Sequence, residues 1–128
     1  MGLEERSERK SAMDDEHRVQ FDLIRALHHA VEEGQDSATI ELLLEQLIDY
    51  SEAHFLSEEF LMRLSNYDAY EDHVEDHRQL IESFRTVLQQ YRSTGRRELI
   101  EQVAKSSMAF MARHIKTRDV HFANWQRR

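Results

Sequence analysis

Two pairs of potential metal ligands lie close together in the middle of the chain. His54 precedes Glu58 by four residues, and His73 precedes His77 by the same interval. Residues four apart lie on one face of an α-helix, so each pair would present two ligand side chains in the same direction. Two such helices, joined by a short polar link, would direct four ligands into one space. These four residues alone would suffice for a zinc ion, which proteins usually bind with four ligands.

The composition predicts the fold that must position these ligands. The 128 residues are enough for one domain with a substantial core. The chain has no proline, only three glycines, and many residues that favour helices. The absence of cysteine excludes disulfides and thiolate metal ligands. The composition therefore favours an all-α protein.

Charge and hydropathy narrow the range of partners. The formal net charge of −8 argues against nucleic acid or an anionic membrane as the main partner. No stretch approaches the roughly 20 apolar residues that a membrane-spanning helix requires. The charged first residues also lack the apolar segment of a secretory signal. We therefore expect no membrane insertion and a cytoplasmic location.

Apolar residues recur at helical spacing in four long segments. We predict helices over about residues 14–33, 37–64 and 69–92, and a fourth from about residue 96 through His114. Gly34 and Gly95 lie in two of the connections, and short connections between long helices predict an antiparallel up-down-up-down four-helix bundle. Residues 1–12 are charged and show no such spacing. We therefore expect an N-terminal arm or linker there, before a four-helix domain at residues 13–128.

Several residues with ligand chemistry fall on the otherwise apolar faces of these helices. They are His17, His54, Glu58, His73, His77 and His114. In an up-down-up-down bundle, the early part of the first helix, the later part of the second, the start of the third and the late part of the fourth lie at the same end. These residues are therefore predicted to form one polar layer. Each needs a partner there, because an unpaired buried charge is very costly.

Asp119 is a further candidate for this layer. It follows His114 by five residues, which on a regular helix places it ~140° away from the face of His114. A π-bulge or an unwound turn near residues 116–118 would bring its carboxylate round, and such bulges are frequent at functional sites.

The complete layer would contain five imidazoles and two carboxylates. That is too many ligands for one tetrahedral zinc ion and is appropriate for two ions, and imidazole suits iron, zinc, copper and nickel. If Glu58 and Asp119 bridge the two ions, the five histidines must divide unequally. The ion with two histidines then keeps an open position, where a small ligand can bind.

Two other interpretations of the layer are weaker. A ferritin-like site needs Glu-x-x-His on two helices, and no glutamate lies three residues before any histidine. The second interpretation is a bundle with hydrogen-bonded core histidines and no metal. Five histidines and two acids in one layer are more than such a core usually holds. A histidine-rich set with two bridging carboxylates fits reversible binding better than oxidation chemistry.

At these positions the chain resembles the bacterial hemerythrin-like proteins, which are single-domain members of the hemerythrin family. Three segments carry the resemblance: MDDEHRVQFDLIRAL, HFLSEEFLMRLSNYDAYEDHVEDH and HIKTRD. They reproduce the family's pattern of a first histidine followed by H-x-x-x-E, H-x-x-x-H and H-x-x-x-x-D. The resemblance covers roughly residues 13–122.

The resemblance implies a four-helix bundle with a non-haem di-iron centre, oxo- or hydroxo-bridged, that binds O2 reversibly. It implies that one iron is held by His73, His77 and His114, the open iron by His17 and His54, and that the bridges are Glu58 and Asp119. It further places Phe55, Phe110, Met111 and Ile115 in the wall of the ligand pocket. Met111 stands where the family usually has leucine. Its more flexible thioether side chain is expected to alter ligand access and autoxidation.

Three functions are open at this point. The first is O2 carriage, storage or delivery. The second is sensing, in which O2, NO or the redox state of the irons signals to a fused or partner module. The third is a di-iron enzyme, such as a peroxidase, an NO-reducing enzyme or a ferroxidase. We rank the enzyme last because the chain offers no positioned general base beyond the ligands.

Overall fold

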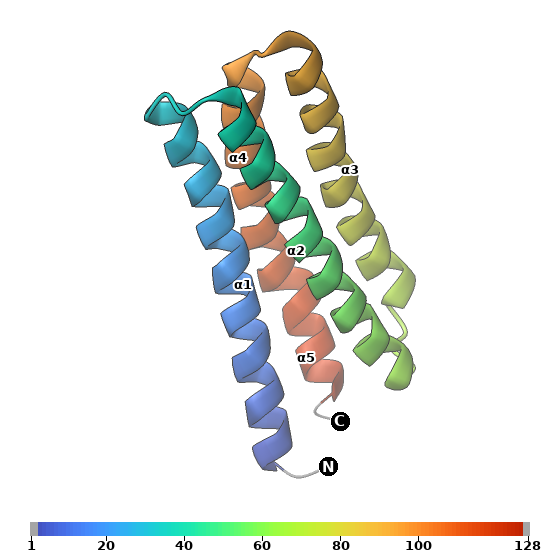
Figure 1. Cartoon of the computed structure of the whole chain (residues 1–128). Helices are drawn as coiled ribbons and strands as arrows, with labels where there is room; N and C mark the ends of the chain where they lie inside the picture. Colours follow the sequence, from blue (N-terminus) through green and yellow to red (C-terminus); the bar gives the residue numbers. More distant parts are fainter. Residues whose placement is uncertain (1–2, 127–128) are drawn as a thin grey trace.

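The structure of the chain, a computed structural model, describes residues 3–126, with side chains described from residue 15 onward. Its elements are α1 (Leu3–Glu32), α2 (Ser37–Leu64), α3 (Tyr70–Thr94), α4 (Arg97–His114), the π-helical segment η1 (Ile115–Asp119) and α5 (Val120–Gln126). Helices α1 to α4 run alternately up and down, and α4, η1 and α5 form one continuous rod (Figure 1). Both α1 and α3 pack against α2 and α4. The predicted all-α, antiparallel four-helix bundle is confirmed, and the described residues contain no strand.

The helix ends follow from local chemistry. Gly34, just beyond the end of α1, has a φ of 70°, and Gly95 at the end of α3 has a φ of 65°. Glycine adopts this left-handed conformation at little cost, which is why it ends helices. Asp36 caps α2 by accepting a hydrogen bond from the backbone N–H of Thr39 at 2.8 Å. Gly34 thus lies in a connection, as the sequence predicted, and Asp36 is the residue that caps α2.

The first helix begins earlier than its apolar spacing predicts. We expected it to start near residue 14, but α1 begins at Leu3, so residues 3–12 are helical and continue α1. This segment contains no glycine or proline and is rich in glutamate, arginine and other helix-favouring residues. Helix propensity thus extends α1 toward the N-terminus beyond the residues that show the apolar pattern. The first turns of α1 project beyond the neighbouring helices (Figure 1). A separation between residues 1–12 and a domain at residues 13–128 stays a prediction.

Two apolar clusters enclose the predicted ligand layer. The larger one fills the body of the bundle and includes Phe55, whose ring stacks on that of His77 with centroids 3.9 Å apart. The smaller one consists of buried Met62, Tyr67 and Phe122, with partly buried neighbours around them. The ring of Tyr67 lies edge-on to that of His73, with centroids 6.4 Å apart. The ligand residues therefore lie between two apolar clusters.

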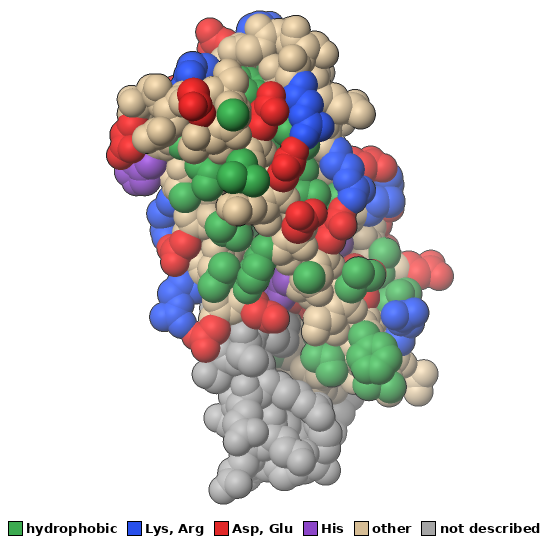
Figure 2. All heavy atoms as spheres, in the orientation of Figure 1, with side chains coloured by type: hydrophobic (Ala, Val, Ile, Leu, Met, Phe, Trp, Pro, Cys, Tyr) green, Lys and Arg blue, Asp and Glu red, His purple; other side chains and the backbone are tan. Residues whose placement is uncertain are grey.

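Some large apolar side chains also remain on the surface along α2 (Figure 2). Leu56, Phe60 and Leu64 follow one another at four-residue intervals and are 63%, 55% and 66% exposed. They lie outside the bundle core, so α2 buries one face and leaves this stripe in solvent. Among the described residues, no helix is long and apolar enough to cross a membrane.

Candidate metal centre

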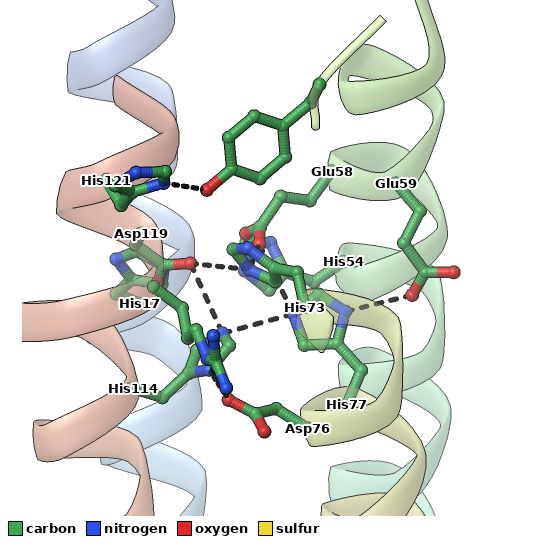
Figure 3. Close-up of polar contacts among 12 residues, drawn as sticks. His17, His54, Glu58, Glu59, His73, Asp76, His77, His114, Asp119 and His121 are labelled. Carbon is green, nitrogen blue, oxygen red and sulfur yellow. Dashed lines mark hydrogen bonds and ion pairs between the residues drawn. The ribbon is translucent and has the colours of Figure 1, made fainter. Parts of the chain in front are cut away.

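All of the predicted metal ligands are buried and lie together in one layer (Figure 3). His17 comes from α1, His54 and Glu58 from α2, His73 and His77 from α3, His114 from α4, and Asp119 from η1. The most exposed of them, His17, is only 7% accessible. Every helix of the bundle thus contributes at least one ligand-type side chain to the layer.

The π-helical segment η1 is what brings Asp119 into this layer. The backbone N–H of Val120 donates a hydrogen bond to the carbonyl of Ile115, which is the five-residue spacing that defines a π-helix. Because each turn then takes more residues than in an α-helix, Asp119 returns to the face of His114. Asp119 is 4% exposed. The sequence predicted either a π-bulge or an unwound turn at this point, and the structure has the π-bulge.

Glu58 directs its two oxygens at different histidines. Its Oε1 atom lies 2.6 Å from Nε2 of His73 and 3.2 Å from Nε2 of His77. Its Oε2 atom lies 3.3 Å from Nε2 of His54. One oxygen thus faces the histidines of α3, and the other faces a histidine of α2.

Asp119 repeats this division from the opposite side of the bundle. Its Oδ1 atom lies 2.9 Å from Nε2 of His73 and 3.2 Å from Nε2 of His114. Its Oδ2 atom lies 3.1 Å from Nε2 of His17. Each carboxylate therefore has one oxygen toward a group of three histidines and one toward the remaining pair.

The donor atoms of the layer are close enough together to bind metal ions, but many of them make no hydrogen bond with one another. The ligand atoms of Glu58, His73, His77, His114 and Asp119 lie within 4.8 Å of one another, as do those of His17, His54 and Glu58. Although the carboxylate oxygens approach the imidazoles closely, several of the inward-facing atoms make no hydrogen bond within the described residues. They are Nε2 of His17, His54 and His73, and both oxygens of Glu58 and Asp119. Unpartnered buried polar atoms are costly, and two metal ions would satisfy them.

The charges in the layer suit cation binding. Burial would raise the pKa of Glu58, but contacts from His54, His73 and His77 outweigh burial and hold that pKa well below its usual value. Burial likewise opposes ionisation of Asp119, and its three facing imidazoles lower its pKa. Both carboxylates are therefore ionised at neutral pH, as metal ligation requires.

The pKa of His73 is shifted in the opposite direction, upward. Burial favours its neutral form, but the carboxylates of Asp119 and Glu58 outweigh burial and raise the pKa of His73 to about 9. In the absence of metal, both nitrogens of this ring are therefore protonated at neutral pH, and the ring is a cationic imidazolium. A bound cation must displace one of these protons.

Three further acids contact the outer nitrogens of the predicted ligand histidines, and sequence reasoning missed them. Nδ1 of His54 lies 2.7 Å from Glu16. Nδ1 of His77 lies 2.9 Å from Glu59, and Nδ1 of His114 lies 3.3 Å from Asp76 (Figure 3). In each pair the acid comes from the preceding helix. An Nδ1–H that donates to a carboxylate leaves the Nε2 lone pair facing inward, ready for a metal.

A sequence signal for these three acids did exist. Glu16 precedes His17, Glu59 follows Glu58, and Asp76 precedes His77. A residue next to a ligand lies about 100° round the helix, given 3.6 residues per turn. That angle points it toward the neighbouring helix and that helix's histidine.

The four residues predicted to line a ligand pocket lie beside the layer. Phe55 stacks on His77, and the ring of Phe110 lies parallel to that of His114 with centroids 6.0 Å apart. Met111 is buried, and Ile115 is partly buried against the same core. Phe110 and His114 also line an open surface cavity of about 690 Å³. Whether these four side chains touch a ligand stays a prediction.

Other aromatic residues cover the end of the layer. Phe122 is fully buried, and Tyr67 packs against both Phe122 and His73. His121 lies on the outside, where its Nδ1 contacts the hydroxyl of Tyr67 (Figure 3). His121 is exposed.

A four-helix bundle that encloses five histidines and two carboxylates, each carboxylate shared between two histidine groups, defines a histidine-rich metal-binding protein. The chain belongs to the hemerythrin family, because the model of the hemerythrin HHE cation binding domain matches residues 10–125. Members of this family hold a non-haem di-iron centre, and the buried layer of this chain offers histidine and carboxylate groups that could hold metal ions. The resemblance that the sequence indicated is therefore confirmed.

One curated relative is the Bacteriohemerythrin of Methylococcus capsulatus. It is 37% identical over 68 residues, which make up 53% of this chain and 51% of that protein. The matched region thus spans about half the length of that relative. No solved structure matches the chain.

Proposed function

We propose that this chain binds O2 reversibly at a di-iron centre held by its buried layer. The observation that carries this proposal is the division of both carboxylates between the same two groups of histidines. A carboxylate with one oxygen toward each group is placed to bridge two cations. We therefore assign Glu58 and Asp119 as bridges.

The histidines divide accordingly. We assign His73, His77 and His114 to one iron, and His17 and His54 to the other. The second iron has fewer protein ligands and so keeps a position for O2. Two bound irons supply the open position and the electrons that O2 binding requires.

The remaining residues act on this centre by orientation and by exclusion of water. The carboxylates of Glu16, Glu59 and Asp76 fix the ring orientation of three ligands. The aromatic cluster around Tyr67 and Phe122 covers the centre.

We propose that the apolar pocket wall comprises Phe55, Phe110, Met111 and Ile115. A dry, apolar wall favours reversible binding, because water and protons promote oxidation of the metal.

The first experiment is metal analysis combined with oxygenation. Protein refolded with iron(II) without air should contain about two irons per chain. Its visible absorption should change on exposure to O2 and return when O2 is removed. An iron content well below two per chain, or an irreversible spectral change, would contradict the proposal.

A second candidate function is sensing, and the length of α1 favours it. The helix that carries His17 continues to Leu3, beyond the ends of its neighbours, so a shift of His17 could be passed along it (Figure 1). Hydrogen exchange of residues 3–16 with and without O2 separates the two functions. A change in exchange supports signalling to a fused or partner module, and unchanged exchange supports carriage or storage.

The enzymatic alternative is tested by turnover. Sustained consumption of peroxide or NO by the iron-loaded protein would favour a di-iron enzyme over a carrier or a sensor. A cytoplasmic location stays a prediction.

A further inference from the structure

Gln20 and Ser51 form a buried polar pair that the ligand set does not use. Gln20 is 1% exposed, Ser51 is fully buried, and Nε2 of Gln20 donates a hydrogen bond to Oγ of Ser51 at 3.1 Å. Apart from the ligands, the buried polar side chains among the described residues are these two and Ser107. Ser107 donates to the carbonyl of Ala104 in its own helix. The Gln20–Ser51 pair, by contrast, links α1 to α2.

The pair lies directly beside the two-histidine half of the centre. Gln20 follows His17 by three residues on α1, and Ser51 precedes His54 by three residues on α2. Because α1 and α2 are antiparallel, the pair joins the same two helices about 4.5 Å further along the bundle axis, at 1.5 Å per residue. The rings of His17 and His54 are themselves in contact, with centroids 5.2 Å apart.

The position of Gln20 on α1 favours an approach of its side chain to the metal layer. Side chains on an α-helix lean toward the helix N-terminus. On α1, the N-terminal direction from Gln20 leads to His17. This tendency favours a Gln20 side chain that extends along α1 toward the turn of His17.

One end of the Gln20 amide makes no hydrogen bond with the described residues. Oε1 of Gln20 is buried and has no hydrogen-bond partner among the described residues. Half a rotation of the amide lets the hydroxyl of Ser51 donate to Oε1, but the amide nitrogen is then the free end. In both orientations Ser51 holds one end of the amide and the other end stays available. A buried polar group without a partner is costly, so an occupant that bonds to it is favoured.

We propose that Gln20, anchored by Ser51, hydrogen-bonds the small ligand at the two-histidine iron and slows its release. The inference rests on the proposed function and deepens it. It identifies the preferred ligands as small oxygen or nitrogen species whose outer atom accepts or donates a hydrogen bond. It also places one polar group in a wall that is otherwise apolar.

Azide bound to the oxidised, iron-loaded protein tests the proposal. Its antisymmetric stretch is measured by infrared spectroscopy in the wild type, in Gln20→Met and in Ser51→Ala. We expect the stretch to shift in Gln20→Met and azide to dissociate about tenfold faster, the effect of losing one hydrogen bond. Ser51→Ala should shift the stretch in the same direction by a smaller amount, because the amide loses its anchor. Exchange into D2O should move the wild-type band and leave that of Gln20→Met unchanged.

Leu27→Met is the matched control, because Leu27 is fully buried on the same helix and seven residues further from the layer. It should leave the azide stretch and the dissociation rate at their wild-type values. An unchanged stretch and rate in both Gln20→Met and Ser51→Ala, with two irons and azide bound, would overturn the proposal. A wild type that binds no iron pair would instead contradict the proposed function.

A purely structural role for the pair is tested without metal. If Gln20 serves a ligand, the double variant Gln20→Met/Ser51→Ala, which removes both partners and leaves neither polar group unpaired, should keep the Tm of the metal-free protein equal or higher. A lower Tm together with an unchanged azide spectrum would show that the pair only joins α1 to α2.

Discussion

At the scale of single residues, the two carboxylates decide how many cations the layer can hold. Glu58 has Oε1 near His73 and His77 and Oε2 near His54, so its two oxygens serve separate groups. A neutral amide of the same shape offers only one acceptor and no charge. The shape of the layer would survive such a change, but its capacity for a second cation would not.

We therefore expect Glu58→Gln to reduce the iron content from about two per chain to one or none, with the helical content retained. Metal analysis after gel filtration measures the loss, and circular dichroism checks the fold. Glu71→Gln is the matched control, because Glu71 is exposed at the start of α3 and should leave the iron content unchanged. A full pair of irons in Glu58→Gln would mean that Glu58 does not bridge.

The acids that contact the outer nitrogens of the histidines, Glu16, Glu59 and Asp76, are expected to affect the affinity for iron and not the number of irons bound. Glu59 accepts from Nδ1–H of His77 at 2.9 Å and is largely buried, with 14% of its side chain exposed. Glu59→Gln keeps an acceptor there but loses the charge that holds the ring. We expect two irons to bind still, with affinity lower by about 10- to 100-fold, as for other partners of ligand histidines. Competition with a chelator measures this, and an affinity equal to that of Glu71→Gln would exclude the role.

The inward residues of the centre were predictable from sequence, and the outer ones were not. The spacing of His54 and Glu58 implies a shared helix face whatever the neighbouring helices do. Glu16 and Asp76 lie to the side of that face. Whether they touch a histidine depends on how far each helix is rotated toward the next, and that rotation is set by packing across the bundle.

At the scale of elements, spacing predicted which segments are helical better than it predicted their limits. On a regular helix Asp119 would point away from the face of His114, and this mismatch indicated a π-bulge or an unwound turn. The structure has the π-bulge. The start of α1 was missed because residues 3–12 have helix propensity but no apolar stripe. On α2, Met62 is fully buried and the neighbouring Leu61 only partly, since the buried face of a long helix gradually rotates relative to a fixed repeat.

The enclosure of the layer by α5 leads to a stability prediction. Phe122 of α5 is fully buried against Tyr67, whereas Phe60 of α2 is 55% exposed. Phe122→Ala should lower the free energy of unfolding by about 3–5 kcal/mol. Phe60→Ala, the same change on the surface, should alter it by about 0.5 kcal/mol or less. Urea unfolding of the metal-free proteins measures both, and equal losses would show that α5 does not pack as described.

At the scale of the whole molecule, the bundle concentrates its buried charge at one end. The body of the bundle is apolar, and the layer gathers two carboxylates and five imidazoles from all four long helices and η1. Without metal, the layer is held together by ion pairs that depend on protonation. With metal, the same residues must lose their protons to act as ligands. The two states should therefore respond to pH in opposite ways.

We expect the metal-free protein to lose stability as the pH rises from about 6.5 to about 9. The pKa of His73 is raised from 6.5 to about 9, so the ion pairs of this ring contribute fully below pH 6.5 and are lost as the pH passes about 9. The pKa values of Glu58 and Asp119 are lowered, so their contribution is present above their usual values and is lost only in stronger acid. Thermal unfolding across this range measures the effect.

The iron-loaded protein should show the reverse trend, because protons compete with iron for the imidazoles and this competition weakens as the pH rises. The difference in Tm between loaded and metal-free protein should therefore widen between pH 6.5 and pH 9. Metal-free His73→Gln is the control, since it lacks the titrating ring and should show a smaller fall in Tm over the same range. Parallel pH profiles for the loaded and metal-free proteins would mean that iron does not bind through these histidines.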